Sequence, residues 1–175
     1  MTKTCDNASV GTVILDKNGN FLMIERKNYP QCFALPAGHL DGDDPEFASK
    51  KECEEEVGIK ILKQRLLFRG RINNPCRRGA SYHDFWGYIA DEWSGEPVSG
   101  SDAKSFFWAS PEKLRKLASR TELFFQKRKL QNNQVGELTR MIFGDPASPK
   151  TDPEWLADPG LEPVWYFLLK SAKVL

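Results

Sequence analysis

The sequence predicts an α/β fold in which helices pack on a mixed β-sheet. The chain has 175 residues, about the length of one domain, and 40% of them are hydrophobic, which is enough to form a packed core. Two strand-like runs precede a helix with clear end signals, and three more follow it before further helical segments. This order of elements is typical of a mixed sheet with helices packed on it.

The chain opens with a predicted hairpin. Residues 9–15 and 21–24 are rich in β-branched and large apolar side chains. Between them lies Asp16-Lys17-Asn18-Gly19-Asn20, whose Asn-Gly pair favours a tight turn, so we expect the two runs to pair with each other. We expect residues 36–44, which are rich in glycine and aspartate, to form a loop.

Residues 44–58 carry the clearest helix signals. Asp44 is a residue type that caps helix N-termini, Pro45 suits the first turn, and Gly58 ends the helix as glycine commonly does. A separate, more apolar face that should meet the sheet consists of side chains spaced by four: Ser49, Cys53 and Val57.

Further strands are predicted beyond this helix, at residues 59–72, 81–91 and 105–109. Ser110-Pro111-Glu112 then begins a second helix by the same capping logic. Residues 145–163 contain five prolines, so we expect them to run over the surface before a final amphipathic helix at about 162–174.

The charge balance argues against binding to nucleic acid or to a membrane surface. The chain holds 25 Lys and Arg against 24 Asp and Glu, so it has no large basic excess for phosphate backbones. Its longest apolar runs are far shorter than the ~20 residues that a membrane span needs. The first residues lack the charged start and apolar stretch of a signal peptide. We expect a cytoplasmic protein with no stable nucleic-acid partner and no membrane association.

The four cysteines are expected to be free or buried thiols. Cys5, Cys32, Cys53 and Cys76 lie at least 21 residues apart, and no pair of Cys or His residues has the spacing of a zinc site. Two disulfides are arithmetically allowed. Cys53, however, falls within the predicted helix, where a small buried thiol is the simpler interpretation.

A cluster of carboxylates on the predicted helix indicates a divalent-metal site. Glu52, Glu55 and Glu56 fall within about a third of the helix circumference at about 100° per residue. Like charges at this spacing destabilise a helix, and partial burial raises that cost. Mg²⁺ removes the penalty, because carboxylate oxygens are the ligands that it prefers. The alternative is a solvated glutamate-rich face, which is the commoner origin of such a triplet.

The residues around this triplet resemble a known motif. The chain presents, at fixed spacing, Gly38, Asp43, Lys51-Glu52-Cys53, Glu55-Glu56 and Gly58-Ile59. This pattern at residues 37–59 resembles the Nudix box, Gly-x5-Glu-x7-Arg-Glu-U-x-Glu-Glu-x-Gly-U, in which U is an aliphatic residue. Other segments that look like this family are residues 10–15, 33–40, 95–97 and 108–114.

The resemblance covers about residues 8–118 and implies a Nudix-type α/β/α sandwich with a mixed β-sheet. We expect one domain over residues 1–175, in which residues from about 119 to 175 form a C-terminal helical extension of that core.

Three departures from the Nudix box concern the site. Ala37 occupies the place of the first glycine, and Gly38 comes one residue late. Asp43 stands where the box has Glu, and Lys51 replaces the Arg that braces a glutamate in the family. Lysine offers a point charge rather than a planar fork, but Lys51 and Glu55 are an i, i+4 pair, so we expect some bracing.

The resemblance implies a pyrophosphohydrolase that cleaves a phosphoanhydride in a nucleoside diphosphate linked to another group. The implied cofactor is Mg²⁺, with Mn²⁺ as a substitute, and the implied partner is a small-molecule nucleotide, while a homodimer is left open. Matching motif positions gives the metal ligands Glu52, Glu55, Glu56 and the backbone carbonyl of Ala37 or Gly38.

Catalytic roles implied by the resemblance fall to Glu52, the candidate base, to Glu55 and to Lys51. Asp102 lies in the loop before the last core strand and is a further candidate ligand, although an ordinary turn aspartate explains it equally well.

The other polar candidates have simpler explanations. His39 and His83 are expected to be structural hydrogen-bonding residues rather than catalytic bases. Solvated charge is the expected role of four arginines: Arg69, Arg71, Arg77 and Arg78.

Few residues bear on the substrate. Compact size and the segment Gly95-Glu96-Pro97 resemble the branch that hydrolyses nucleoside triphosphates, including oxidised ones, to the monophosphate and pyrophosphate. Pro75, 16 residues after Ile59, matches a position where the ADP-ribose pyrophosphatase subgroup typically has proline, so ADP-ribose is the alternative. Alternatives of other classes are a non-catalytic nucleotide-binding module and a scaffold that works through the proline-rich tail.

Overall fold

The computed structural model describes residues 3–100 and 103–175 and confirms the mixed sheet with helices on it. The main sheet has the order β4 (Ala37–His39), β1 (Ala8–Val13), β6 (His83–Ser94) and β5 (Lys60–Ile72). β1 and β6 run parallel, whereas the other two pairs are antiparallel. An antiparallel second sheet has the order β3 (Phe33–Ala34), β2 (Phe21–Arg26) and β7 (Ala103–Ala109).

The predicted hairpin forms only next to its turn, because its two runs then enter different sheets. β1 pairs with β4 and β6, whereas β2 pairs with β3 and β7. The turn between them forms as its sequence predicts, since Asp16 accepts hydrogen bonds from the backbone N–H groups of Asn18 and Asn20 at 2.8 Å. A single bridge between Leu15 and Phe21 follows before the strands diverge. The turn depends on local side-chain chemistry, whereas the partner that each strand pairs with depends on tertiary packing.

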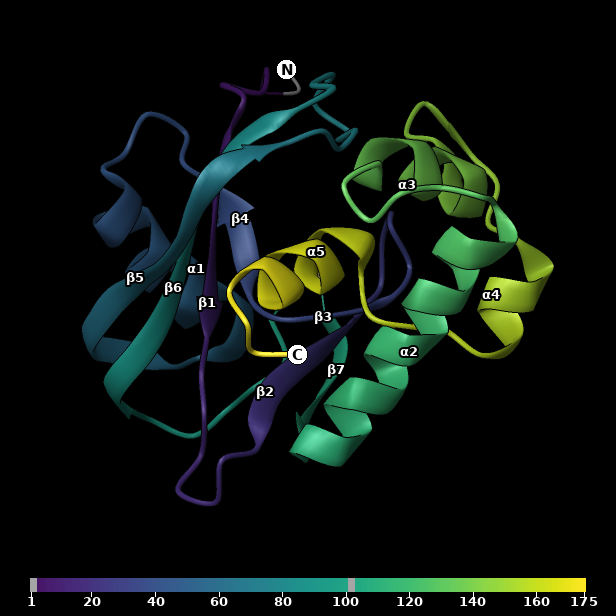
Figure 1. Cartoon of the computed structure of the whole chain (residues 1–175). Coiled ribbons are helices and arrows are strands. Elements are labelled where there is room, and N and C mark those ends of the chain that lie inside the picture. Colours follow the sequence, from purple (N-terminus) through teal and green to yellow (C-terminus); the bar gives the residue numbers. More distant parts are fainter. Residues whose placement is uncertain (1–2, 101–102) are drawn as a thin grey trace.

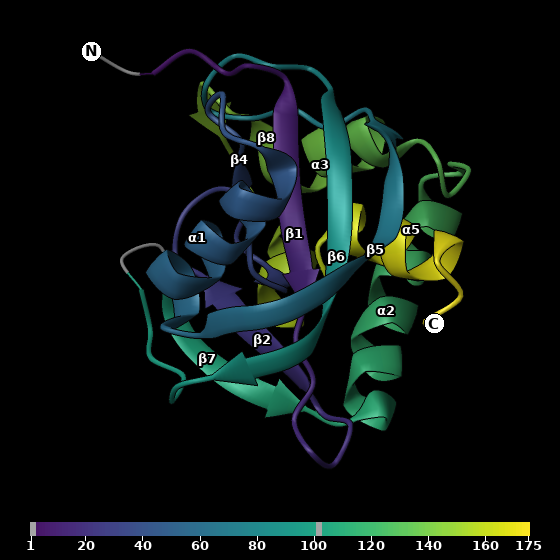
Figure 2. The same cartoon turned by 90° about the vertical axis from the view of Figure 1, so that its left-hand side faces the viewer.

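Helices cover both faces of the main sheet (Figure 1). α1 (Pro45–Val57) packs on one face and α5 (Pro163–Ser171) on the other, as the turned view in Figure 2 also shows. The remaining elements are α2 (Pro111–Lys127), α3 (Val135–Phe143), β8 (Gly144–Asp145), β9 (Ser148–Pro149) and α4 (Pro153–Ala157). In the part of the chain that the structure describes, no helix has both the length and the apolar character needed to cross a membrane.

α1 forms where its end signals predict. The Asp44 side chain accepts hydrogen bonds from the backbone N–H groups of Glu46 and Phe47, and Gly58 ends the helix in the left-handed conformation at φ 68°. The predicted inward face is buried, with Ser49 Oγ lying 2.7 Å from Thr12 Oγ1 of β1. This contact fixes how α1 is rotated on the sheet and therefore where its glutamates point.

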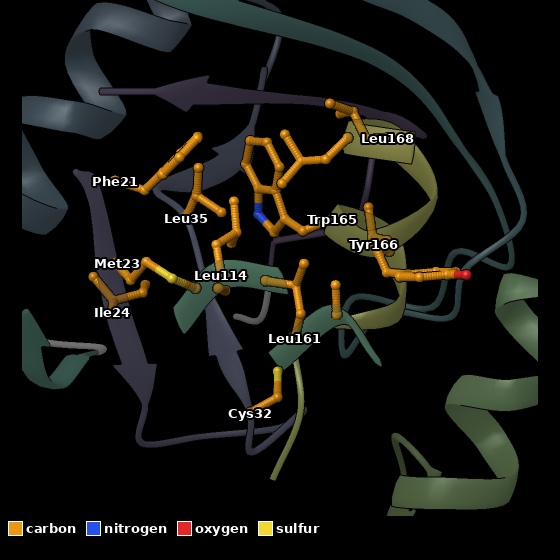
Figure 3. Close-up of a cluster of buried hydrophobic side chains, with 14 of the residues drawn as sticks. Phe21, Met23, Ile24, Cys32, Leu35, Leu114, Leu161, Trp165, Tyr166 and Leu168 are labelled. Atoms are coloured by element: carbon orange, nitrogen blue, oxygen red, sulfur yellow. The ribbon is translucent and has the colours of Figure 1, made fainter. Parts of the chain in front are cut away.

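α5 is a core helix rather than an amphipathic one. Trp165 is fully buried, and a Cβ placed on Gly11 of β1 would lie only 2.5 Å from Trp165 Cζ2, so the glycine lets the indole pack on the strand. Figure 3 shows Trp165 and Leu168 of α5 pointing into the same apolar cluster as Phe21 of β2. The sheet needs an apolar cover on its second face, and this requirement overrides the amphipathic pattern expected for the segment.

The proline-rich segment at 145–163 does not simply run over the surface. Trp155 in α4 is fully buried and meets the rings of Phe124 and Phe143 edge-on, with centroid distances of 5.1 and 5.4 Å. Its indole N–H donates to the backbone oxygen of Gln31 at 3.0 Å. One aromatic anchor thus ties the segment to the core.

Candidate active site

A cleft of about 460 Å³ lies at the end of the main sheet where β1 and β6 begin. Its walls come from β4, α1, the turn between β5 and β6, and the start of α5. Small-molecule sites occupy about 300–1,000 Å³, so the cleft has the size of a ligand site. Both signs of charge line it: Glu52, Glu56 and Glu162 are acidic, and Lys3, Arg26, Arg77 and Arg78 are basic.

Gly38 provides the space that Glu52 occupies. A Cβ placed on Gly38 would lie 2.0–2.4 Å from the carboxylate atoms of Glu52, so a larger residue displaces that side chain. Gly38 pairs with Val10 of β1, and this pairing fixes its backbone. The glycine that comes one residue late in the motif is therefore the one in contact with the helix carboxylate.

Glu56 of α1 is held by Ala37, the residue next to Gly38 in β4. Its Oε2 accepts a hydrogen bond from the backbone N–H of Ala37 at 2.9 Å. Burial raises the pKa of Glu56 to about 8, although Arg26 and the Ala37 N–H favour its charged form. Burial likewise raises the pKa of Glu52, and the nearby charge of Glu55 adds to this effect.

These carboxylates fit a divalent cation. The donors are hard oxygens, which Mg²⁺ and Mn²⁺ accept. The raised pKa values of Glu52 and Glu56 mean that the protein's own cations do not fully compensate the buried charge. A cation among these oxygens would supply the missing compensation.

The predicted site residues do not all reach the cleft. Glu52, Glu56 and Ala37 line it together. Glu55 and Lys51 are exposed on the same helix and are not part of its lining. Asp102 lies outside the described residues.

Several cleft residues were not expected from the sequence. Arg77 and Arg78, predicted to be solvated charges, line the cleft, and Arg78 also pairs with Asp41 at 2.6 Å. Arg26 of β2 and Glu162, which precedes α5, line it as well. Burial raises the pKa of Glu162, and Arg26 opposes that rise. No local pattern marks these two residues, because they reach the cleft only through the packing of the second sheet and α5.

Comparison with known proteins identifies the family. The NUDIX domain family matches residues 6–130, which is most of the chain. The chain belongs to the Nudix family. A crystal structure of a MutT NUDIX hydrolase from Burkholderia pseudomallei has a TM-score of 0.53 and 27% identity, covering 61% of this chain and 84% of that one. The Nudix fold expected from the sequence is confirmed.

Two curated relatives match shorter stretches of this Nudix protein. An 8-oxo-dGTP diphosphatase from Haemophilus influenzae is 34% identical over 92 residues, which are 52% of this chain and 64% of that protein. An RNA pyrophosphohydrolase from Rhodospirillum rubrum is 35% identical over 52 residues, which are 29% of this chain and 32% of that protein. The chain thus spans less than two thirds of the length of either relative.

Two departures from the Nudix box are the two ends of one ion pair. Lys51 Nζ lies 3.2 Å from Asp43 Oδ2, and the hydrogen bond to Asp43 raises the pKa of Lys51. Glu55, the partner expected from helix spacing, acts on Lys51 only as a weaker nearby charge. The side chains of Lys51 and Asp43 are 44% and 35% exposed, so their pair links the loop to α1 with little net free energy.

Proposed function

We propose that this Nudix protein is a divalent-metal-dependent pyrophosphohydrolase that acts on a nucleoside triphosphate, including oxidised forms, and releases the monophosphate and pyrophosphate. Mg²⁺ is the proposed metal, with Mn²⁺ as a substitute. The observation that carries the proposal is a pair of partly buried carboxylates in a cleft that also holds basic side chains: Glu52 lies against Gly38, and Glu56 is bonded to Ala37.

The residues of the chain divide the work of such a site. Glu52, Glu55 and Glu56 would hold the metal, with a backbone carbonyl at Ala37 or Gly38 as a further ligand. A divalent ion neutralises phosphate charge and makes bound water more acidic. Ala37 fixes one oxygen of Glu56 through its N–H and so orients the carboxylate. Glu52 is the candidate general base, because it is partly buried and faces the cleft.

The cleft also suits the rest of a nucleotide. Arg26, Arg77 and Arg78 supply guanidinium groups that bind phosphate oxygens well. Similarity to the 8-oxo-dGTP diphosphatase favours an oxidised nucleoside triphosphate among such substrates.

ADP-ribose is the second candidate substrate, and Pro75 is the observation that favours it. Pro75 lies at the position where that subgroup typically has proline, and it is buried and lines the cleft. A proline there restricts the backbone of the wall that the turn between β5 and β6 supplies.

Product analysis tests the proposal. The protein is incubated in ¹⁸O-water with Mg²⁺ and one substrate at a time: dGTP, 8-oxo-dGTP or ADP-ribose. We expect a nucleoside monophosphate and pyrophosphate from the triphosphates, with label in either product. Cleavage of ADP-ribose to AMP and ribose 5-phosphate, with intact triphosphates, would select the second candidate. Release of labelled orthophosphate alone would refute the proposed chemistry.

A matched pair of variants on α1 separates catalysis from folding. Glu56→Gln keeps the volume but removes a charge from the cleft, so we expect at least a 100-fold loss of kcat. Glu54→Gln changes an exposed carboxylate on the same helix and should leave kcat unchanged. Equal activity of the two variants would show that the glutamate cluster is not the catalytic site. Nucleotide binding without turnover would favour the non-catalytic alternative.

A further inference from the structure

A second group of potential metal ligands lies at the same end of the main sheet. Cys5, His39, Cys76 and His83 each present one ligand atom, and these four atoms all lie within 4.8 Å of one another. All four cysteines of the chain are free thiols, so Cys5 and Cys76 are available. None of these four side chains belongs to the carboxylate cluster on α1.

The sheet topology explains how such distant residues meet. β1 lies between β4 and β6, and Ser9 pairs with His39 while Ala8 pairs with Asp84. The segment that leads into β1 therefore runs beside the end of β4 and the start of β6, where Cys5, His39 and His83 converge. Cys76 joins them from the turn between β5 and β6. Sequence spacing cannot find this group, because zinc-site patterns rely on ligands that are close in the chain.

Both histidines are arranged as metal ligands commonly are. His83 Nδ1 lies 2.8 Å from Asn74 Oδ1, and its Nε2 lies 3.3 Å from Cys5 Sγ. A metal-binding imidazole typically donates a hydrogen bond from its second nitrogen to a neighbouring oxygen. Here Asn74 Oδ1 is placed to accept such a bond from His83 Nδ1. His39 Nε2 is buried and has no hydrogen-bond partner among the described residues. A buried, unpartnered ring nitrogen is costly unless something absent from the protein chain satisfies it.

We propose that Cys5, His39, Cys76 and His83 bind one zinc ion at a site distinct from the glutamate site. Two thiolates and two imidazoles are a ligand set typical of structural zinc, and four protein ligands leave no open position for substrate. Zn–S bonds of about 2.3 Å and Zn–N bonds of about 2.0–2.1 Å place tetrahedral ligand atoms about 3.3–3.8 Å apart. The ligand atoms need to approach one another by at most about 1.5 Å to reach this geometry.

The zinc ion would brace one wall of the cleft. His39 directly follows Gly38, and Cys76 follows Pro75 and precedes the cleft arginines. The same ion would tie the segment before β1, which has no strand of its own at Cys5, to both of these places. Its role is therefore to position the cleft, while the chemistry stays with the glutamates.

Metal content tests the proposal independently of any activity. The reduced apoprotein is loaded with Zn²⁺ in the presence of excess Mg²⁺ and desalted, and its zinc content is measured by inductively coupled plasma mass spectrometry. We expect one zinc ion per chain. Loading with Co²⁺ should give intense visible bands and a near-ultraviolet thiolate-to-cobalt band. No retained zinc, or a cobalt spectrum without the thiolate band, would overturn the proposal. The zinc content does not depend on hydrolytic activity, so a protein without the proposed activity would still test this proposal.

Three cysteine variants locate the site. Cys5→Ser and Cys76→Ser should lose most of the zinc. Cys32→Ser should keep it, because Cys32 is a buried free thiol outside the group, whose Sγ donates to the Pro30 oxygen at 3.2 Å. Equal zinc in all three variants would place the ion elsewhere and refute the assignment.

Thiol labelling of the wild-type protein decides the matter where a variant fails to fold. Zinc should slow alkylation of Cys5 and Cys76, as mapped by peptide mass spectrometry, and a chelator should restore it. Alkylation that is unaffected by zinc would overturn the proposal. So would a Cys5–Cys76 disulfide in protein that was prepared under reducing conditions and loaded with zinc.

Discussion

Gly38→Ala should remove most activity without unfolding the protein. The new methyl group would lie 2.0 Å from the Glu52 carboxylate carbon, whereas ordinary contacts begin at about 3.4 Å, so the carboxylate must move by more than 1 Å. The obstructing atoms are the far end of a flexible side chain, so the fold can accommodate the change at small cost. A misplacement of about 1 Å in a catalytic group costs on the order of 100-fold in rate. We expect a loss of this size in kcat/KM and a Tm close to that of the wild type.

The assay is steady-state hydrolysis with Mg²⁺, together with thermal unfolding of the same samples. Gly19→Ala is the matched control, since Gly19 has φ 77° and open space around it in a turn far from Glu52. It should show the reverse pattern, a stability loss of about 1 kcal/mol with normal kcat/KM. Gly38→Ala should add no further loss in a Glu52→Gln background, because both act through one carboxylate. Wild-type activity of Gly38→Ala, or a further loss in the double variant, would refute the reasoning.

Three further predictions concern the ion pair and the core. Lys51→Arg should preserve or raise kcat, because a planar guanidinium can make two hydrogen bonds to Asp43; a large fall in kcat at unchanged Tm would instead give Lys51 a role of its own. Lys51→Ala should leave the midpoint of urea unfolding almost unchanged, because the ion pair is exposed to solvent. Trp155→Ala should lower it by about 3–5 kcal/mol, because the indole is fully buried against two aromatic rings. A loss below 1 kcal/mol at Trp155 would contradict its role as an anchor.

Local chemistry accounts for what the sequence could predict. The ends of α1 depend on Asp44 and Gly58, which act on backbone groups two to five residues away. The positions of Glu52 and Glu56 on that helix then follow from its geometry. A short motif and its caps are enough to locate this part of the candidate site.

Long-range packing accounts for what the sequence could not predict. The run at 21–24 has the pattern of a hairpin strand, but a different sheet offers it better partners in β3 and β7. The partner of Lys51 is Asp43 in the preceding loop rather than the helix neighbour Glu55, because the loop folds back on α1. Glu162 and Cys76 reach the cleft from turns whose positions depend on the whole sheet.

The contact between Gly11 and Trp165 joins the first strand to the last helix, and it constrains the order in which the protein can be completed. During synthesis, β1 and the glutamate helix leave the ribosome long before α5 does. Until then, the apolar face that the Trp165 indole covers stays exposed to water and to other unfinished chains. Loop closure over so many residues is slow, and exposed apolar strands aggregate. The nascent chain therefore has α1 and its glutamates early, but it acquires a closed cleft and protection from aggregation only once α5 has emerged and packed.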